Sequence, residues 1–353
     1  MVFVSGPRQV GKTTMALDMA GGNDGYLNWD VAEHRERLLT RELPPTPLWI
    51  FDEIHKYRRW RNFLKGLYDS RRSGQRMLVT GSARLDYYRY GGESLQGRYH
   101  ALRLHPFSWA ELGLSSAADL ETLLTLGGFP EPFLSGSQVE ARRWSREYRT
   151  RLVQDEITSL ERVHDLGTLE QLVLALPARV GSMLSVNSLR EDLQVNHKTV
   201  ATWLAILERL YAIFRVSPFG SPRLRSIRKA QKHYHFDWSL VQDEGARFEN
   251  LVASHLLKWV HYQQDAQGRD LDLRYFRDVA GREVDFVVVD RRTPVLMVEC
   301  KLADEVVAPP LKYLKGRWPA CDAWQVSVRG RKDYLTPDGI RVAPAPALLS
   351  TLL

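Results

Sequence analysis

The chain has 353 residues, of which 44% are hydrophobic and 26% are charged, a balance typical of folded globular domains rather than of disordered or fibrous chains. No apolar run approaches the ~18 residues of a membrane span, and the N-terminus lacks the basic and apolar regions of a signal peptide. The net charge of +7 favours a polyanionic partner, and Cys300 and Cys321 are not spaced as metal ligands, so the sequence predicts a cytoplasmic protein without a membrane partner.

The first predicted elements are a buried strand over residues 1–4, a glycine-rich loop and a helix over residues 14–20. The loop matches the phosphate-binding pattern G-x-x-x-x-G-K-[ST] at each fixed position, and its glycines allow backbone N–H groups to surround phosphate oxygens. Lys12 is predicted to contact the β- and γ-phosphates of ATP, and Thr13 to ligate Mg²⁺. The predicted ATP-binding residues are Gly6, Pro7, Arg8, Gln9, Val10, Gly11, Lys12, Thr13 and Thr14.

A second strand is predicted over residues 26–30, a charged helix over 31–42, and a third strand over 48–51 that ends in Asp52 and Glu53. In a parallel sheet, ligands bind beyond the carboxyl ends of the strands. Asp52 is therefore predicted to hold Mg²⁺ through water, and Glu53 to orient and polarise the attacking water. The alternative is that the two acidic residues only cap the next helix.

A helix over residues 55–72 and a strand over 75–79 follow. A polar residue just beyond this strand would sense the γ-phosphate; Ser82 is the first candidate and Thr80 the second, and the alternative is an ordinary Gly-Ser turn. The alternation of strands and helices predicts a parallel sheet flanked by helices.

Arg98 ends a glycine-rich segment and precedes a predicted strand over residues 99–104. An arginine in this position could reach the γ-phosphate of a neighbouring subunit as an arginine finger, which makes a homo-oligomer a candidate state. The alternative is an ordinary surface arginine.

Six motifs now stand in one order along the chain, at residues 6–13, 48–53, 80–82, 95–98, 105–108 and 127–131. Together they resemble the prokaryotic family of AAA-type ATPases that carry a C-terminal domain of unknown function. The resemblance covers essentially the whole chain. It implies ATP binding and an AAA-like core, and it implies no single biological role because the members are diverse.

Residues 113–181 read as mostly helical, with a long charged helix from about residue 138 to 162, and resemble the small helical lid that follows an AAA core. Residues 182–240 have the pattern of a winged helix.

That pattern consists of a short helix capped by Ser188, a helix over residues 198–211 with one apolar face, and two strands near 212–217 and 233–236. The residues between the strands are basic: Arg223, Arg225, Arg228, Lys229 and Lys232. A recognition helix with a basic wing on phosphates would bind DNA. The alternative is packing within the chain or against a protein.

Residues 241–353 carry a second candidate site. Glu249 lies on the apolar face of a predicted helix, where a carboxylate is costly unless it is paired or metal-bound. A predicted hairpin sets Asp285 opposite Glu299, with Lys301 on the same sheet face as Glu299. Cross-strand neighbours lie ~5 Å apart, close enough for two carboxylates to share a metal ion.

These four residues resemble the signature of restriction-endonuclease-like domains. The resemblance implies that Glu249, Asp285 and Glu299 hold Mg²⁺ and that Lys301 positions or activates water. The alternative is a hairpin whose polar side chains only face solvent. Many domains of this kind have lost activity or only bind.

The predicted fold is α/β: a P-loop AAA-like ATPase core (residues 1–112), a helical lid (113–181), a winged helix (182–240) and a restriction-endonuclease-like domain (241–353). Two functions fit these predictions, and both use ATP and Mg²⁺. In the first, an ATPase acts on DNA or a DNA-bound partner and the C-terminal domain is a candidate metal-dependent nuclease. In the second, ATP is a switch, and an inactive C-terminal domain binds a protein partner.

Overall fold

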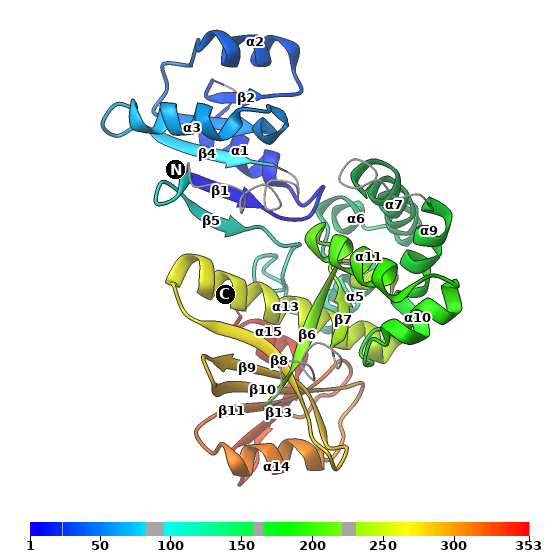
Figure 1. The fold of residues 1–353 in the computed structure, drawn as a ribbon. Helices are drawn as coiled ribbons and strands as arrows, with labels where there is room; N and C mark the ends of the chain where they lie inside the picture. Colours follow the sequence, from blue (N-terminus) through cyan, green and yellow to red (C-terminus); the bar gives the residue numbers. More distant parts are fainter. Residues whose placement is uncertain (23, 82–94, 158–164, 221–230, 353) are drawn as a thin grey trace. The chain divides into compact units, whose positions relative to one another are not determined.

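The computed structural model describes residues 1–22, 24–81, 95–157, 165–220 and 231–352, whose elements are drawn in Figure 1. The chain divides into two compact units. The first comprises residues 1–106 and 209–211, and the second comprises residues 107–208 and 212–353. Each unit has its own sheet and its own hydrophobic core.

The first unit contains a five-stranded sheet in the order β2-β3-β4-β1-β5, and all of its strand pairs are parallel. The strands are β1 (Val2–Ser5), β2 (Tyr26–Asn28), β3 (Leu48–Asp52), β4 (Arg76–Thr80) and β5 (His100–Arg103). The helices are α1 (Lys12–Ala20), α2 (Ala32–Thr40), η1 (Ile54–Lys56) and α3 (Trp60–Asp69). The predicted parallel sheet with flanking helices is confirmed. Because the strands run in one direction, their carboxyl ends meet at one edge, where the glycine-rich loop also lies.

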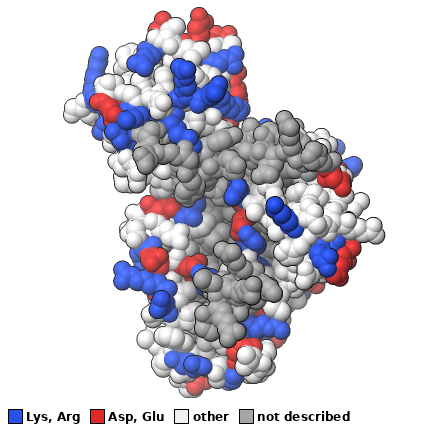
Figure 2. All heavy atoms as spheres, in the orientation of Figure 1, with Lys and Arg blue, Asp and Glu red and all other residues white. Residues whose placement is uncertain are grey.

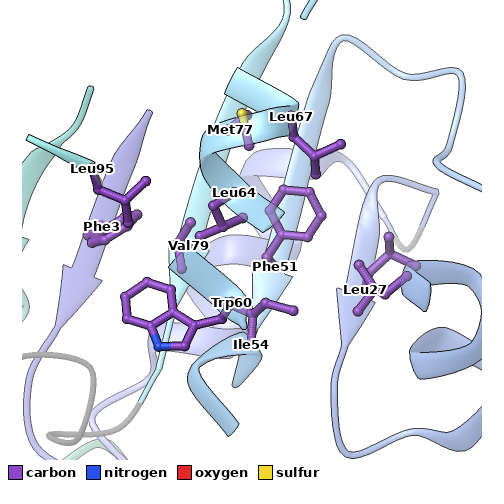
Figure 3. Close-up of a cluster of buried hydrophobic side chains, with 11 residues drawn as sticks. Phe3, Leu27, Phe51, Ile54, Trp60, Leu64, Leu67, Met77, Val79 and Leu95 are labelled. Carbon is purple, nitrogen blue, oxygen red and sulfur yellow. The ribbon is translucent and has the colours of Figure 1, made fainter. Parts of the chain in front are cut away.

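The core of this unit explains why α3 forms where it does. Phe3, Phe51 and Val79 project from neighbouring strands, and Trp60 and Leu64 pack onto them from α3 (Figure 3). The apolar residues of α3 recur at helical spacing, so one face of the helix is buried while the other stays polar. A second cluster beneath α1 covers the opposite face of the sheet. The strands are therefore buried on both sides, which accounts for their nearly continuous apolar sequences.

The second unit begins with helices, as the sequence predicts. They are α5 (Ala117–Leu126), α6 (Pro130–Ser135), α7 (Gln138–Arg151), α9 (Leu166–Ala175) and the short η4 (Pro177–Arg179). Side chains of Ser116, Ser137 and Asp165 accept backbone N–H groups in the first turns of α5, α7 and α9, so each start is fixed locally. The predicted long helix keeps α-helical geometry only to Arg151 and continues as a π-helical segment, η3 (Leu152–Ile157).

The helices α10 (Val186–Leu193) and α11 (His197–Arg209) precede two strands, β6 (Ile213–Phe219) and β7 (Lys232–His235). The prediction of Ser188 as the N-cap is wrong. The N-cap is Ser185, three residues earlier, because Ser185 Oγ accepts the Ser188 N–H at 3.1 Å.

The strand β6 has two different partners along its length. Its first half pairs with β7, and its second half pairs in parallel with β8 (Leu271–Arg277). The two predicted strands therefore form one end of the eight-stranded sheet that the C-terminal residues build. Assignment of this region as a winged helix stays a prediction.

The burial of Lys232 corrects a second prediction. Its side chain is only 2% exposed, so it cannot serve as a wing residue that contacts DNA phosphates. The other predicted wing residues, Arg223, Arg225, Arg228 and Lys229, lie outside the described residues. On the face drawn in Figure 2, Lys and Arg side chains lie intermixed with Asp and Glu.

The C-terminal sheet has the strand order β12-β13-β11-β10-β9-β8-β6-β7. Its further strands are β9 (Glu283–Asp290), β10 (Thr293–Lys301), β11 (Asp322–Ser327), β12 (Tyr334–Leu335) and β13 (Ile340–Pro344). The helices are η5 (Trp238–Leu240), α13 (Glu244–Gln267), α14 (Pro309–Arg317) and α15 (Ala345–Leu349). Val298 pairs with Phe286 in the antiparallel β9–β10 hairpin, so Asp285 and Glu299 become neighbours, as predicted. None of the helices described is both long enough and apolar enough to cross a bilayer.

Candidate functional site

The loop between β1 and α1 has the backbone geometry of an anion-binding turn. Gly6, Gln9 and Gly11 have φ values of 148°, 60° and 93°. A Cβ atom on Gly6 would lie 2.2 Å from the Leu104 carbonyl oxygen, so the position admits only glycine. Gly11 precedes α1, and no side chain in the described part of the chain caps that helix end. The N–H groups of the first turn are therefore available to an anion.

Lys12 is the buried cation of this loop. Its Nζ donates to the carbonyl oxygens of Gly6 at 3.1 Å and Pro7 at 2.5 Å. The remaining predicted ATP-binding residues divide by exposure: Val10 is buried, Gln9 is half-buried, and Arg8, Thr13 and Thr14 are exposed. The lysine is thus held inside the curve of the loop, where phosphate oxygens would replace the two carbonyls.

Asp52, at the carboxyl end of β3, is the centre of a group of hydroxyls. Its Oδ2 accepts hydrogen bonds from Thr13 Oγ1 at 2.8 Å and Tyr26 OH at 2.7 Å, and its Oδ1 accepts one from Thr80 Oγ1 at 2.8 Å. Burial, followed by the neighbouring carboxylate, raises the pKa of Tyr26, so the phenol remains a donor at neutral pH. The structure therefore brings Asp52 and Thr13, both predicted to serve Mg²⁺, into direct contact.

Glu53 follows Asp52 in a left-handed conformation with φ 55°. Its carboxylate lies 3.2 Å from Lys56 Nζ and 3.7 Å from His55 Nε2, and Lys56 also donates to Asp30 Oδ2 at 2.5 Å. Burial opposes the charge of Lys56, but Asp30 and Glu53 together raise its pKa. Although Glu53 precedes η1, its side chain makes no capping hydrogen bond within the described structure. This geometry does not favour the alternative of a simple helix cap.

The structure describes one of the two predicted γ-phosphate sensors and the predicted arginine finger. Thr80, the second sensor candidate, contacts Asp52, whereas Ser82, the first, lies outside the described residues. Arg98 pairs with Asp69 of α3 through two hydrogen bonds, from Nε at 2.9 Å and from Nη2 at 3.3 Å. A finger role would require Arg98 to leave this pair.

These residues fit ATP with Mg²⁺ by the chemistry of their groups. The hydroxyl of Thr13 and the carboxylate of Asp52 are hard oxygen donors of the kind that Mg²⁺ prefers. The Lys12 ammonium and the uncapped start of α1 supply positive charge for phosphate oxygens.

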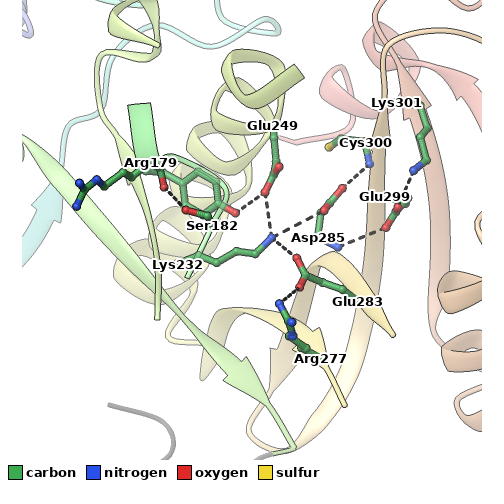
Figure 4. A network of polar contacts seen from close by, with 11 residues as sticks. Arg179, Ser182, Lys232, Glu249, Arg277, Glu283, Asp285, Glu299, Cys300 and Lys301 are labelled. Carbon is green, nitrogen blue, oxygen red and sulfur yellow. Dashed lines mark hydrogen bonds and ion pairs between the residues drawn. The ribbon is translucent and has the colours of Figure 1, made fainter. Parts of the chain in front are cut away.

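The C-terminal candidate site is a buried network of charges (Figure 4). Lys232 Nζ, from β7, lies 2.6 Å from Glu283 Oε1, 3.3 Å from Glu249 Oε1 and 4.0 Å from Asp285 Oδ1. Glu249 comes from α13, and Glu283 and Asp285 come from one face of β9. An ammonium group therefore lies among three carboxylates.

The carboxylates have further partners. Glu249 Oε1 accepts the Tyr234 OH at 2.7 Å, Asp285 Oδ2 accepts the Cys300 N–H at 2.9 Å, and Glu299 Oε1 pairs with Lys301 Nζ at 3.0 Å. Glu249, Asp285, Glu299 and Lys301 thus lie on the predicted elements, and the Asp285 N–H is 3.4 Å from Glu299 Oε2.

Burial dominates the ionisation of this network. Burial, followed by the charge of Asp285, raises the pKa of Glu249 and of Glu299 to about 7, and burial also raises the pKa of Asp285. Burial opposes the charge of Lys232, but Glu249, Asp285 and Glu283 raise its pKa above the usual value.

The predicted metal ligands do not fit a shared Mg²⁺ as they stand. Across the described residues, no group of three or more His, Cys, Asp and Glu side chains is arranged to hold a metal ion. Glu249 and Asp285 converge instead on the Lys232 ammonium, and Glu299 is turned toward Lys301.

Sequence reasoning missed three residues of this network: Lys232, Tyr234 and Glu283. Part of the network could be read from residue spacing. Lys232 and Tyr234 are two residues apart in one strand, and Glu283 and Asp285 are two apart in another, so the side chains of each pair lie on the same face of their strand. Nothing in the pattern showed that the two faces would meet, since the position of β7 depends on long-range pairing with β6 and on contacts with α13.

Comparison with known proteins divides the chain into three regions. Residues 1–113 match the AAA domain family, residues 117–244 match a domain of unknown function (DUF8612), and residues 244–348 match another domain of unknown function (DUF4143). Two similar proteins are the uncharacterized protein Rv2008c of Mycobacterium tuberculosis and the uncharacterized protein Mb2031c of Mycobacterium bovis. Each is 24% identical over 356 residues, which cover 91% of this chain and 78% of the relative.

The matches support an AAA-type ATPase domain at the N-terminus and a C-terminal domain of unknown function. None of the matched families is named for a winged helix or a restriction endonuclease, so these two assignments stay predictions.

Proposed function

We propose that the N-terminal unit binds ATP together with Mg²⁺ and hydrolyses the bond to the γ-phosphate. The observation that carries this proposal is the meeting of a buried Lys12, Thr13 and Asp52 at the carboxyl edge of a parallel sheet. The AAA domain match over residues 1–113 supports the same chemistry.

Each residue has a defined task in this proposal. Lys12 exchanges the Gly6 and Pro7 carbonyls for phosphate oxygens, and the N–H groups at the start of α1 bind the phosphates. The Thr13 hydroxyl and, through water, Asp52 would hold Mg²⁺, which supplies charge neutralisation at the β- and γ-phosphates. Glu53 orients the attacking water, and its ion pair with Lys56 fixes the direction of the carboxylate.

ATP affinity tests the first part of the proposal. Lys12→Ala removes a charged contact worth about 1.5–3 kcal/mol, which corresponds to roughly 10- to 150-fold weaker binding. Lys56→Ala is the matched control, because it removes a lysine at the same edge that contacts Glu53 and Asp30 rather than the loop. Equal affinity in wild type and Lys12→Ala would refute the assignment, as would an equal loss in the control.

We also propose that Arg98 acts as an arginine finger in an assembled form. Its pair with Asp69 is exposed to solvent and contributes little to stability, so Arg98 can leave it at small cost. Arg98→Ala should therefore lower turnover and leave ATP affinity unchanged, whereas Asp69→Ala, which releases the arginine without removing it, should not lower turnover. Equal turnover in wild type, Arg98→Ala and Asp69→Ala would show that Arg98 is an ordinary surface residue and not a finger.

For the C-terminal half we propose a catalytically inactive module that passes the nucleotide state to a protein partner. The support is that Glu249, Asp285 and Glu299 are each engaged by protein groups. The competing hypothesis is an ATPase that acts on DNA or a DNA-bound partner with a Mg²⁺-dependent nuclease. Incubation of DNA with the full chain and Mg²⁺ or Mn²⁺, with and without ATP, separates them. Cleavage that Asp285→Ala abolishes would establish the nuclease instead.

A further inference from the structure

The Lys232 ammonium lies inside the C-terminal carboxylate cluster, and the proposed ATPase makes no use of it. Glu283, Glu249 and Asp285 each direct an oxygen toward its Nζ, at 2.6, 3.3 and 4.0 Å. Its side chain is 2% exposed. A lysine this deeply buried persists only where its charge is compensated, and these carboxylates supply the compensation.

The second oxygens of Asp285 and Glu283 have partners of their own. Asp285 Oδ2 accepts the Cys300 N–H, and Glu283 Oε2 pairs with Arg277 Nη1 at 3.1 Å. The second oxygen of Glu249 lies against Gly181, where a Cβ atom would come within 2.8 Å of Oε2. Asp285 and Glu283 are thus held through both oxygens, and Glu249 is held through Oε1 by Tyr234 and Lys232.

A divalent ion in this cluster would need several of these oxygens at about 2.0–2.6 Å from one point. The space toward which they converge contains Lys232 Nζ. Two cations cannot share it, because the ammonium and the metal would repel each other in a buried site.

We propose that Lys232 is the resident cation of this cluster. Its ammonium takes the place of a divalent metal ion, ties β7 to α13 and β9, and prevents Mg²⁺ and Mn²⁺ from binding between Glu249 and Asp285. Removal of the lysine side chain opens a metal site. This inference concerns the C-terminal sheet and does not depend on the ATPase activity proposed above.

The test uses Mn²⁺ alone, with the full chain in the absence of nucleotide, and measures bound Mn²⁺ by electron paramagnetic resonance together with melting temperature. Wild type and Asp285→Asn should bind the same amount of Mn²⁺. Lys232→Ala should melt at a lower temperature, gain one Mn²⁺ site per chain at least about tenfold tighter than any in wild type, and recover melting temperature as Mn²⁺ is added. The double variant Lys232→Ala/Asp285→Asn should lose that gain.

Lys258→Ala is the matched control, since Lys258 is another largely buried lysine of the same unit and pairs with Glu111 rather than with this cluster. It should lose stability without gaining a Mn²⁺ site. A folded Lys232→Ala that binds no additional Mn²⁺ would overturn the proposal. If Lys232→Ala does not fold, Mn²⁺ binding to wild type and to Asp285→Asn tests the inference. A Mn²⁺ site in wild type that is lost in Asp285→Asn would overturn it, and equal Mn²⁺ binding by the two proteins would support it.

Discussion

Gly6→Ala should damage the nucleotide site through the backbone alone. The added Cβ atom would lie 2.2 Å from the Leu104 carbonyl oxygen, and the contact must open by about 0.8 Å to reach 3.0 Å. Leu104 N–H donates to Ser5 O at 2.8 Å beside this contact, so the shift strains the junction between β1 and β5. Loss of that hydrogen bond costs about 1 kcal/mol. A non-glycine residue at φ 148° adds about 1–3 kcal/mol.

The expected loss for Gly6→Ala is therefore about 2–4 kcal/mol in the free energy of unfolding, together with loss of ATP binding. Gly21→Ala is the matched control: Gly21 also has positive φ, 68°, but nothing lies within 4 Å of its Cβ position. It should cost only about 1–2 kcal/mol and keep ATP affinity. Urea unfolding and ATP titration measure both quantities. Equal stability and equal affinity in the two variants would refute the steric reasoning.

Two further predictions concern the C-terminal unit. The pKa of Glu249 is raised from 4.5 to about 7 on folding, so its favourable contribution is complete below about pH 4.5 and is lost as pH rises through 7. Glu249→Gln should therefore gain stability relative to wild type between pH 5 and pH 8 in denaturant titrations, and a difference independent of pH would contradict the assigned shift. Asn250 is fully buried and forms two hydrogen bonds with the His235 backbone. Its Oδ1 accepts the His235 N–H at 2.8 Å, and its Nδ2 donates to the His235 carbonyl oxygen at 2.7 Å. Asn250→Ala should cost about 2–4 kcal/mol, because it leaves two buried backbone groups without these partners; a loss below about 1 kcal/mol would show that β7 is held by other contacts.

The N-terminal fold could be predicted because its signals are local. Short apolar runs predicted the strands, the pattern of residues 55–72 predicted the helix that contains α3, and the glycine pattern predicted the loop. The site followed from one topological rule, that parallel strands place Asp52 and the loop at the same edge. Tyr26 as a partner of Asp52 was missed, because a register between β2 and β3 is needed to place it there.

The C-terminal site was predictable only in part, because only some of its residues are placed by local signals. Asp285 and Glu299 meet across the β9–β10 hairpin, in a register that is reached after an irregularity between Pro294 and Leu296. Lys232 is 53 residues before Asp285, and its position depends on the division of β6 between β7 and β8. No local pattern determines such long-range pairing, so a lysine assigned to the surface proved to be the buried centre of the cluster.

The most direct test of the central claim is Mg²⁺-dependent release of phosphate from ATP by wild type and by Glu53→Gln. Hydrolysis by the N-terminal unit predicts that wild type releases phosphate and that Glu53→Gln retains ATP affinity while its turnover falls by roughly 10²-fold or more, because only the residue that prepares water has changed. Equal release by the two proteins would contradict the role of Glu53, and ATP binding without any release by wild type would contradict hydrolysis itself.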